Sequence, residues 1–255
     1  MPGSGAGVGT HTWTLHTGGR LTPAETRTLL PALAKMHARH AVGRLAMLVH
    51  LNSGRRAQLP PGTLTPPSSV LTRAAQEQAE QRLTPALLGH SHRTYAFGMA
   101  VGALEGVEVD AELLFAAAML HDIGLTGPRT PVDFTVSSAR AALNVAEDVG
   151  LSTAATETMR TAITLHHSPG VTVADGPVAY LLSAGAGVDV AGLKSWTLPP
   201  DVLTSVVRDR PRLGFKREFT DVWRAEASAV PAGRARLLRR YGAFDLAIRL
   251  APFEE

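Results

Sequence analysis

The sequence contains no cysteine, and this absence excludes several kinds of chemistry at once. Disulfide bonds, cysteine-ligated zinc sites and thiol nucleophiles are all unavailable to the chain. The longest apolar stretches, such as residues 45–51 and 113–120, fall far short of the roughly 20 residues that span a bilayer. Because the glycine-rich amino terminus also lacks the pattern of a secretory leader, we expect a cytoplasmic protein with no membrane partner.

Charged and aromatic residues are also scarce, at 18% and 5% of the chain. The 25 basic residues barely exceed the 22 acidic ones, and the arginines are interleaved with acids. The densest basic run, residues 234–240, lacks the aromatic side chains that stack on bases, so we interpret it as a solvated helix face. We therefore expect no nucleic-acid partner. The 45% apolar content across 255 residues instead predicts a globular protein with a sizeable core.

Helical signals dominate the rest of the chain. Thr22, Pro23 and Glu25 have the spacing of a capped helix start, followed by an apolar stripe that continues to Leu48. Proline-rich residues 60–69 indicate a linker, and no clear strand signal follows it. Asp110 is expected to cap a helix, and Gly124 to end it in a left-handed conformation. We predict an all-α fold with further helices over residues 69–82, 84–103, 110–124, 134–149, 152–167, 177–193, 201–207 and 219–227.

The same signals divide the chain into three parts. We predict a disordered tail over residues 1–20, an N-terminal helical extension with a linker over 21–65, and the main helical domain over 66–255. The narrow apolar stripe of the N-terminal helix is expected to pack on the main domain. A lid, a dimer contact and a docking element for a partner are alternative roles for that helix.

Histidines and aspartates on separate helices suggest a metal site. His121 and Asp122 end the most apolar helix of the chain, where burying an unpaired imidazole and carboxylate costs free energy that a divalent cation would remove. His90 lies early in its helix, on the face that Phe97 and Val101 continue at helical spacing. These three residues are therefore expected to point inward.

Asp189 and His166 complete the set. Asp189 lies on the predicted inward face of its helix, and His166 ends a helix just before residues 168–170. Each residue alone is more often a hydrogen-bonded structural group than a ligand. Together, His90, His121, Asp122 and Asp189 make a shell of two imidazoles and two carboxylates that suits one divalent ion, Zn²⁺ or Fe²⁺ before Mn²⁺.

The order of His90, the His121-Asp122 pair and Asp189 resembles that of the HD-domain superfamily of metal-dependent hydrolases. Five segments are similar to the cyanamide hydratase branch: residues 88–98, 120–126, 162–166, 187–190 and 211–216. The resemblance covers residues 68–255. It implies that residues 66–255 form an HD-domain helical bundle with C-terminal helices, holding one metal through those four residues.

The resemblance also implies a reaction on a small-molecule substrate. Metal-activated water would add to the carbon of a cyanamide-like nitrile, giving a urea-like product, with Asp122 or His166 moving the proton. His166 is alternatively a further metal ligand or a substrate contact. Arg93 would pair with a ligand carboxylate or meet an anionic substrate. Lys216 is a weaker substrate-binding candidate, for which a solvated surface lysine is the alternative.

Other readings stay open at this point. The wider superfamily suggests a nucleotide phosphohydrolase, although the motif segments supply few of the cations that hold phosphoryl oxygens. A dinuclear iron oxygenase would need His166, and also His167, to hold a second ion. A non-catalytic binding module and a homo-oligomer are further possibilities. His37 and His40 are spaced three apart, but we expect them on a polar helix face rather than at a metal.

Overall fold

The computed structural model describes residues 7–255, and these residues form twelve α-helices and no strand. The all-α prediction is confirmed. No helix within this described part is both long and apolar enough to cross a membrane. The helices are α1 (His11–Thr17), α2 (Pro23–Leu48), α3 (Val70–Arg82), α4 (Pro85–Glu105), α5 (Ala111–Leu120), α6 (Thr135–Asp148), α7 (Thr153–Leu165), α8 (Pro177–Ala191), α9 (Pro200–Asp209), α10 (Phe215–Ala229), α11 (Arg234–Tyr241) and α12 (Phe244–Arg249).

Several helix starts lie where their capping residues predict them. The Thr22 hydroxyl accepts a hydrogen bond from the Glu25 amide, and the Glu25 carboxylate accepts one from the Thr22 amide. Asp110 caps α5 through the amides of the next turn. The prediction for Gly124 is wrong, because this glycine lies in a short 3-10 turn, η2 (Ile123–Leu125), and is not left-handed. It is needed for close packing, since a Cβ there would lie 2.0 Å from the carbonyl oxygen of Phe134.

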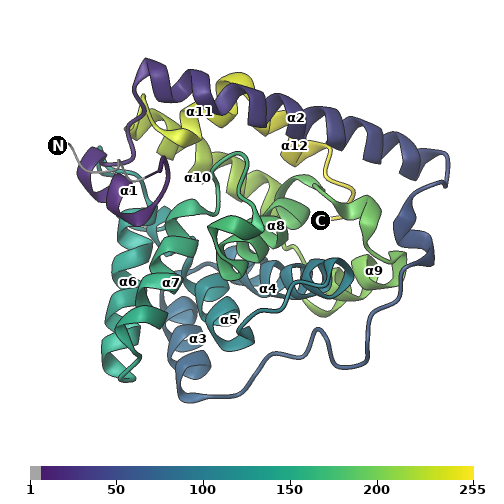
Figure 1. Cartoon of the computed structure of the whole chain (residues 1–255), viewed down its shortest axis with the longest axis horizontal. Helices are drawn as coiled ribbons and strands as arrows, with labels where there is room; N and C mark the ends of the chain where they lie inside the picture. Colours follow the sequence, from purple (N-terminus) through teal and green to yellow (C-terminus); the bar gives the residue numbers. More distant parts are fainter. Residues whose placement is uncertain (1–6) are drawn as a thin grey trace.

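Helices α4, α5 and α8 form the centre of the molecule (Figure 1). All of α5 from Leu113 to Leu120 is buried, as is most of α4 and α8. Helices α3, α6 and α7 pack on α5, and α6 also packs on α3 and α7. Helices α9 and α10 pack on α4, and α12 packs on α8. A helix that is apolar on every side needs neighbours on every side, and this arrangement supplies them.

The closest helix pair is α4 and α8. A Cβ at Gly185 in α8 would lie 2.0 Å from the carbonyl oxygen of Thr94 in α4, and one at Gly98 would lie 2.8 Å from that of Leu181. Both positions therefore require glycine. Because His90 lies one turn before Thr94 and Asp189 one turn after Gly185, the same contact brings these two side chains together.

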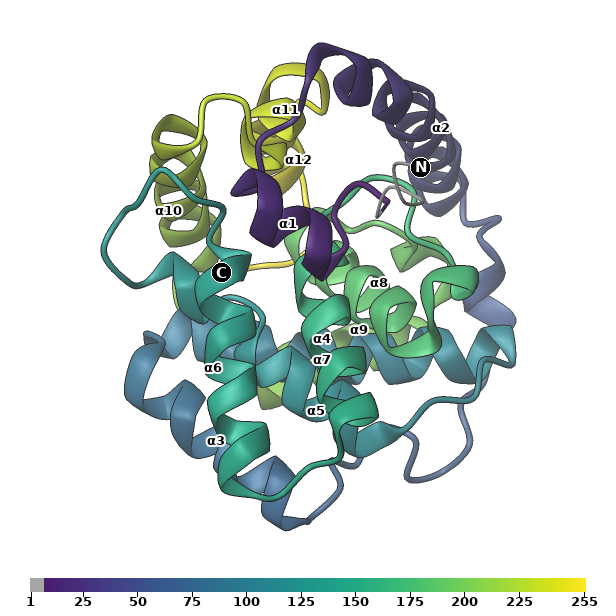
Figure 2. The same ribbon diagram turned by 60° about the vertical axis from the view of Figure 1, so that its left-hand side comes forward.

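The N-terminal region differs from the prediction in two ways. The expected tail over residues 1–20 is wrong for residues 11–17, which form α1 and pack against α7, and residues 1–6 lie outside the described part (Figure 2). Burial of Trp13, whose indole donates a hydrogen bond to Glu25, explains why residues 11–17 form a helix rather than a disordered tail. The apolar stripe predicted along α2 is only half right, since Leu33 is buried while Leu45 and Leu48 are 61% and 75% exposed.

Candidate metal centre

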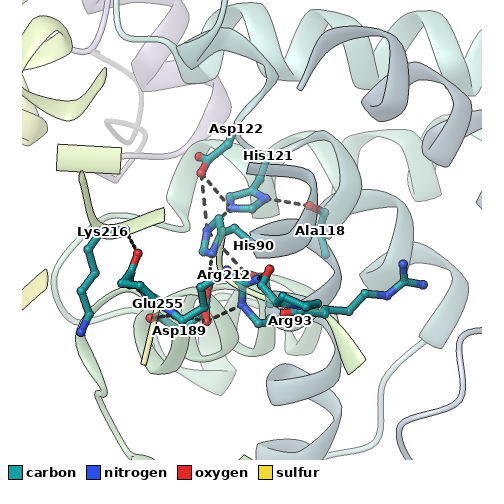
Figure 3. Close-up of polar contacts among 12 residues, drawn as sticks. His90, Arg93, Ala118, His121, Asp122, Asp189, Arg212, Lys216 and Glu255 are labelled. Carbon is teal, nitrogen blue, oxygen red and sulfur yellow. Dashed lines mark hydrogen bonds and ion pairs between the residues drawn. The ribbon is translucent and has the colours of Figure 1, made fainter. Parts of the chain in front are cut away.

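His90, His121 and Asp122 converge at the end of α5 (Figure 3). The Nε2 atoms of the two histidines lie 3.2 Å apart, and Asp122 Oδ2 lies 3.5 Å from His90 Nε2 and 3.3 Å from His121 Nε2. All three side chains are buried. The structure thus brings together three of the four predicted ligands, with one donor atom of each facing the others.

Two of the histidines in this region are oriented by their own helix. His121 and His166 follow directly after α5 and α7, and each places Nδ1 2.7 Å from a carbonyl oxygen three residues earlier, that of Ala118 and that of Ile163. An Nδ1–H that donates to a carbonyl leaves the Nε2 lone pair free for a ligand. In both residues this Nε2 is the atom nearest to Asp122.

The Asp122 carboxylate fits a bound cation. Both of its oxygens are buried and neither has a hydrogen-bond donor. Burial raises the pKa of this carboxyl, but the neighbouring imidazoles, His121 above all, outweigh burial and hold the pKa below its usual range. Burial lowers the pKa of His90 and of His166, which keeps both imidazoles in the neutral form that binds metals, whereas the Asp122 carboxylate outweighs burial and raises the pKa of His121. Imidazole nitrogens that converge on a buried carboxylate without donors suit a divalent ion such as zinc, iron or manganese.

Asp189 lies behind His90 rather than beside the other three residues. Its Oδ2 lies 2.7 Å from His90 Nδ1, on the opposite side of the ring from the converging Nε2. Arg93 donates to both carboxylate oxygens, at 2.8 and 2.9 Å, and Arg212 donates to Oδ1 at 2.7 Å. The remaining Arg93 bonds go to the backbone carbonyls of residues 210 and 211. Arg93 therefore has the ion-pair role that the sequence offered as one alternative, and it is fully buried and does not line the cavity described below.

Lys216 does not reach the site. Its ammonium donates to the carbonyl oxygens of Ala251 and Phe253, at 3.1 and 2.7 Å, and its amide donates to Glu255. Figure 3 shows its side chain directed away from the histidines. The structure corrects the prediction of a substrate-binding role, because the motif that contains Lys216 instead fastens the C-terminal segment to α10.

His166 and His167 both border the site, although the helical register predicted only the first. His166 Nε2 lies 3.6 Å from Asp122 Oδ1, the carboxylate oxygen that does not face His90. Because α7 ends at Leu165, His167 is released from the helical register. Its ring packs between Phe134 and Trp223, with centroid distances of 5.2 and 5.7 Å.

A buried ion pair supports His167 from behind. Asp133 lies 3.4 Å from His167 and accepts a 3.0 Å hydrogen bond from Arg234. The same guanidinium donates to the Thr164 carbonyl and to the Ser168 hydroxyl. The interpretation of residues 234–240 as a wholly solvated face is therefore wrong at Arg234, which is fully buried.

A cavity of about 110 Å³ opens onto these side chains. Its polar lining consists of His37, His40, His90, His121, Asp122, His166, His167, Ser168 and Ser183. The rest of the lining is apolar or glycine, from Met36, Pro169, Ala186, Gly187, Val190, Ala191, Leu193, Phe219, Trp223, Leu238, Gly242, Phe244 and Ala247. The cavity is slightly smaller than an engineered cavity of about 150 Å³ that binds benzene, so it suits a ligand of a few heavy atoms.

The α2 residues in this lining contradict the polar face expected for His37 and His40. The spacing 33, 36, 40, 43 and 47 runs along one side of a helix, and Leu33, Met36, His40 and Gly43 on it are buried or partly buried. The sequence signal was present but concealed, because a histidine and a glycine occupy two positions of the inward stripe.

Residues 87–194 match the family model described as the HD domain. The matched segment is shorter than half of the 255-residue chain and contains His90, His121, Asp122, His166 and Asp189. No curated protein matches the chain. The match supports the HD-domain superfamily, and with the His-His-Asp group it indicates a metal-dependent hydrolase of the HD type. The cyanamide hydratase branch stays a prediction.

Proposed function

We propose that this chain is a metal-dependent hydratase or hydrolase that adds water to a small, neutral carbon–nitrogen substrate, with cyanamide as the representative. The lining of the cavity carries the proposal. Among residues 7–255 it is built from histidines, one aspartate, two serines, apolar groups and glycines, with no lysine or arginine. Sites that cleave phosphate esters hold the phosphoryl oxygens with several cations, so this lining favours a neutral substrate over a nucleotide.

The residues of the site have separate roles in the proposed reaction. His90, His121 and Asp122 would hold the ion, which when bound activates water at neutral pH and polarises the substrate. Asp122 Oδ1 accepts a proton from the attacking water, and His166 Nε2, 3.6 Å from that oxygen, takes up this proton and passes it to the substrate nitrogen. A C–O bond forms at the nitrile carbon as one C–N π bond breaks, and its electron pair takes the proton. Tautomerisation then gives urea.

A dinuclear iron oxygenase is the second candidate. Asp122 presents its two oxygens to different histidines, Oδ2 to His90 and His121 and Oδ1 to His166. A carboxylate with two unpartnered oxygens in this position can serve two ions. Two metal ions per chain by elemental analysis would favour this activity, whereas one ion favours the hydratase.

The test is to load purified protein with zinc or iron and to measure urea release from cyanamide and phosphate release from a panel of nucleotides. We expect urea and no phosphate. Asp122→Asn should lose the bound metal and reduce urea formation by at least about a hundredfold, because the only carboxylate among the three convergent donors is lost. Asp148→Asn, at an exposed aspartate of α6, is the charge-matched control. Phosphate release without urea would refute the proposal.

A further inference from the structure

Helix α2 forms one wall of the cavity although it lies outside the segment that matches the HD domain. It runs along the outside of the molecule, beside α11 and the turn η4 (Ser195–Thr197) (Figures 1 and 2). Met36, His37 and His40 line the cavity from this side. The histidines of the metal centre enter from α4 and from the ends of α5 and α7, so a ligand in the cavity has α2 as a second wall.

Trp196 supports helix α2 at this wall of the cavity. A Cβ at Gly43 would lie 2.0 Å from Trp196 Cδ2, so α2 rests directly on that indole. The His40 ring stacks on the same indole, with centroids 5.9 Å apart and an interplanar angle of 23°. Beyond the end of α2, Asn52 donates a 3.2 Å hydrogen bond to the Trp196 carbonyl. These contacts fix the position of the His40 imidazole at the cavity.

One nitrogen of the His40 ring has no hydrogen-bond partner. Its Nε2 is buried and has no partner, although the residue as a whole is only partly buried. Burial lowers the pKa of His40, and the nearby charges of Arg44 and His37 lower it further. The ring is therefore neutral at pH 7, and in the tautomer that carries its proton on Nδ1 the lone pair of Nε2 accepts a hydrogen bond. A buried acceptor without a donor costs free energy, which a ligand N–H would recover.

We infer that His40 is a specificity-determining residue that accepts a hydrogen bond at Nε2 from an N–H group of the substrate. The inference rests on the proposed function and narrows it to small neutral molecules that carry both a carbon–nitrogen multiple bond and an N–H donor. Cyanamide has both features. Dimethylcyanamide keeps the nitrile and lacks the N–H, so it cannot use His40.

The experiment compares these two probes on the zinc-loaded full chain. Calorimetry gives the Kd of each, and urea or dimethylurea release gives KM and kcat. His40→Ala should raise the Kd and KM for cyanamide about fivefold to tenfold, the effect of one hydrogen bond, and leave kcat and the dimethylcyanamide Kd nearly unchanged. His40→Gln, which keeps an acceptor, should restore part of the affinity. Arg39→Ala, on the exposed side of α2, is the matched control.

The outcomes distinguish a failure of the proposed reaction from a failure of the proposed His40 contact. If cyanamide binds but no urea forms, the proposed reaction fails, and the His40 variants still test the contact through Kd. If His40→Ala keeps its metal and helical content and binds cyanamide as tightly as the wild type, the inference about His40 is overturned. Equal losses for both probes overturn it as well, because they show a general change in the wall. No binding of cyanamide by the wild type overturns both.

Discussion

The three histidines nearest Asp122 are oriented in the same way. In each, a hydrogen-bond acceptor lies next to Nδ1, and this contact turns Nε2 toward Asp122. For His121 and His166 the acceptor is a backbone carbonyl, whereas for His90 it is the carboxylate of Asp189. A carboxylate makes the imidazole a more basic ligand than a carbonyl does. The negative charge of the Asp189 carboxylate is balanced by two buried guanidinium groups, those of Arg93 and Arg212.

Replacing Asp189 by Asn tests this positioning role. The change leaves the Arg93 and Arg212 charges without their buried partner, so the free energy of unfolding should fall by about 3–5 kcal/mol. Metal affinity should fall by about 10- to 100-fold, the usual effect of losing the group that orients a ligand. Chemical denaturation and metal competition titrations measure the two quantities.

Asp209→Asn is the control for that variant, because Asp209 pairs with Arg208 on the surface and should contribute less than about 1 kcal/mol. Complete loss of metal binding with unchanged stability would mean that Asp189 coordinates the ion directly, as the sequence predicted.

The sequence could place Asp189 on an inward helix face but could not assign its role. A metal ligand and a carboxylate that orients a histidine need the same residue type on the same face. Only the positions of the Arg93 and Arg212 side chains distinguish these two roles, and Arg212 lies outside the helix that carries Asp189. His121 and Asp122 were easier to identify, since burial of both at the end of an apolar helix has few explanations besides a cation.

At the scale of helices, local signals were sufficient for most of the fold and failed where tertiary contacts decide. Caps at Thr22 and Asp110 identified helix starts because the signal lies within one turn. Helix α1 escaped detection because its surroundings are rich in glycine and threonine, and its order comes from burying Trp13. Short helices gain most of their stability from such packing rather than from propensity.

The crossing of α4 and α8 leads to a second prediction. Gly185→Ala should gain helix propensity, yet its Cβ would meet the Thr94 carbonyl at 2.0 Å and force the helices apart. We expect a net loss of about 1–3 kcal/mol of stability together with weaker metal binding, since His90 and Asp189 move with these helices. Thermal unfolding with and without zinc checks both effects.

Gly187→Ala on the same helix is the comparison, because the nearest atoms to its Cβ would belong to the Leu193 side chain, the first at 3.1 Å, and not to backbone. This variant should be neutral or more stable than the wild type. Equal destabilisation by both substitutions would contradict the assignment of Gly185 to the helix crossing.

For the molecule as a whole, the candidate metal centre and the cavity beside it have different origins in the chain. The segment matching the HD domain carries the candidate ligands, whereas much of the cavity wall comes from α2, α10 and α12. Met36, His40, Trp223 and Phe244 all lie outside that segment. The motif therefore predicts the ion and the reaction class, while the size and polarity of the substrate depend on segments with no motif of their own.

One of these outer segments also contributes to the pH dependence of the protein's stability. Glu226 in α10 accepts a 3.0 Å hydrogen bond from the Phe134 amide at the start of α6. Burial, and then the nearby Asp133 charge, raise the pKa of Glu226 to about 7. A carboxyl whose pKa is higher in the folded than in the unfolded state binds more protons when folded, so the contribution of Glu226 to the free energy of unfolding falls as the pH rises from about 4.5 to about 7.

Glu226→Gln should remove this dependence while keeping the acceptor for the Phe134 amide. The expected gain is about 3 kcal/mol at pH 8, where the wild-type carboxylate is ionised at a cost, and close to zero at pH 4, where it is protonated in both states. Denaturation of both proteins at the two pH values measures it, with Glu147→Gln at an exposed glutamate of α6 as the control. An equal gain at both pH values would show that the amide improves packing and that ionisation of Glu226 does not limit stability.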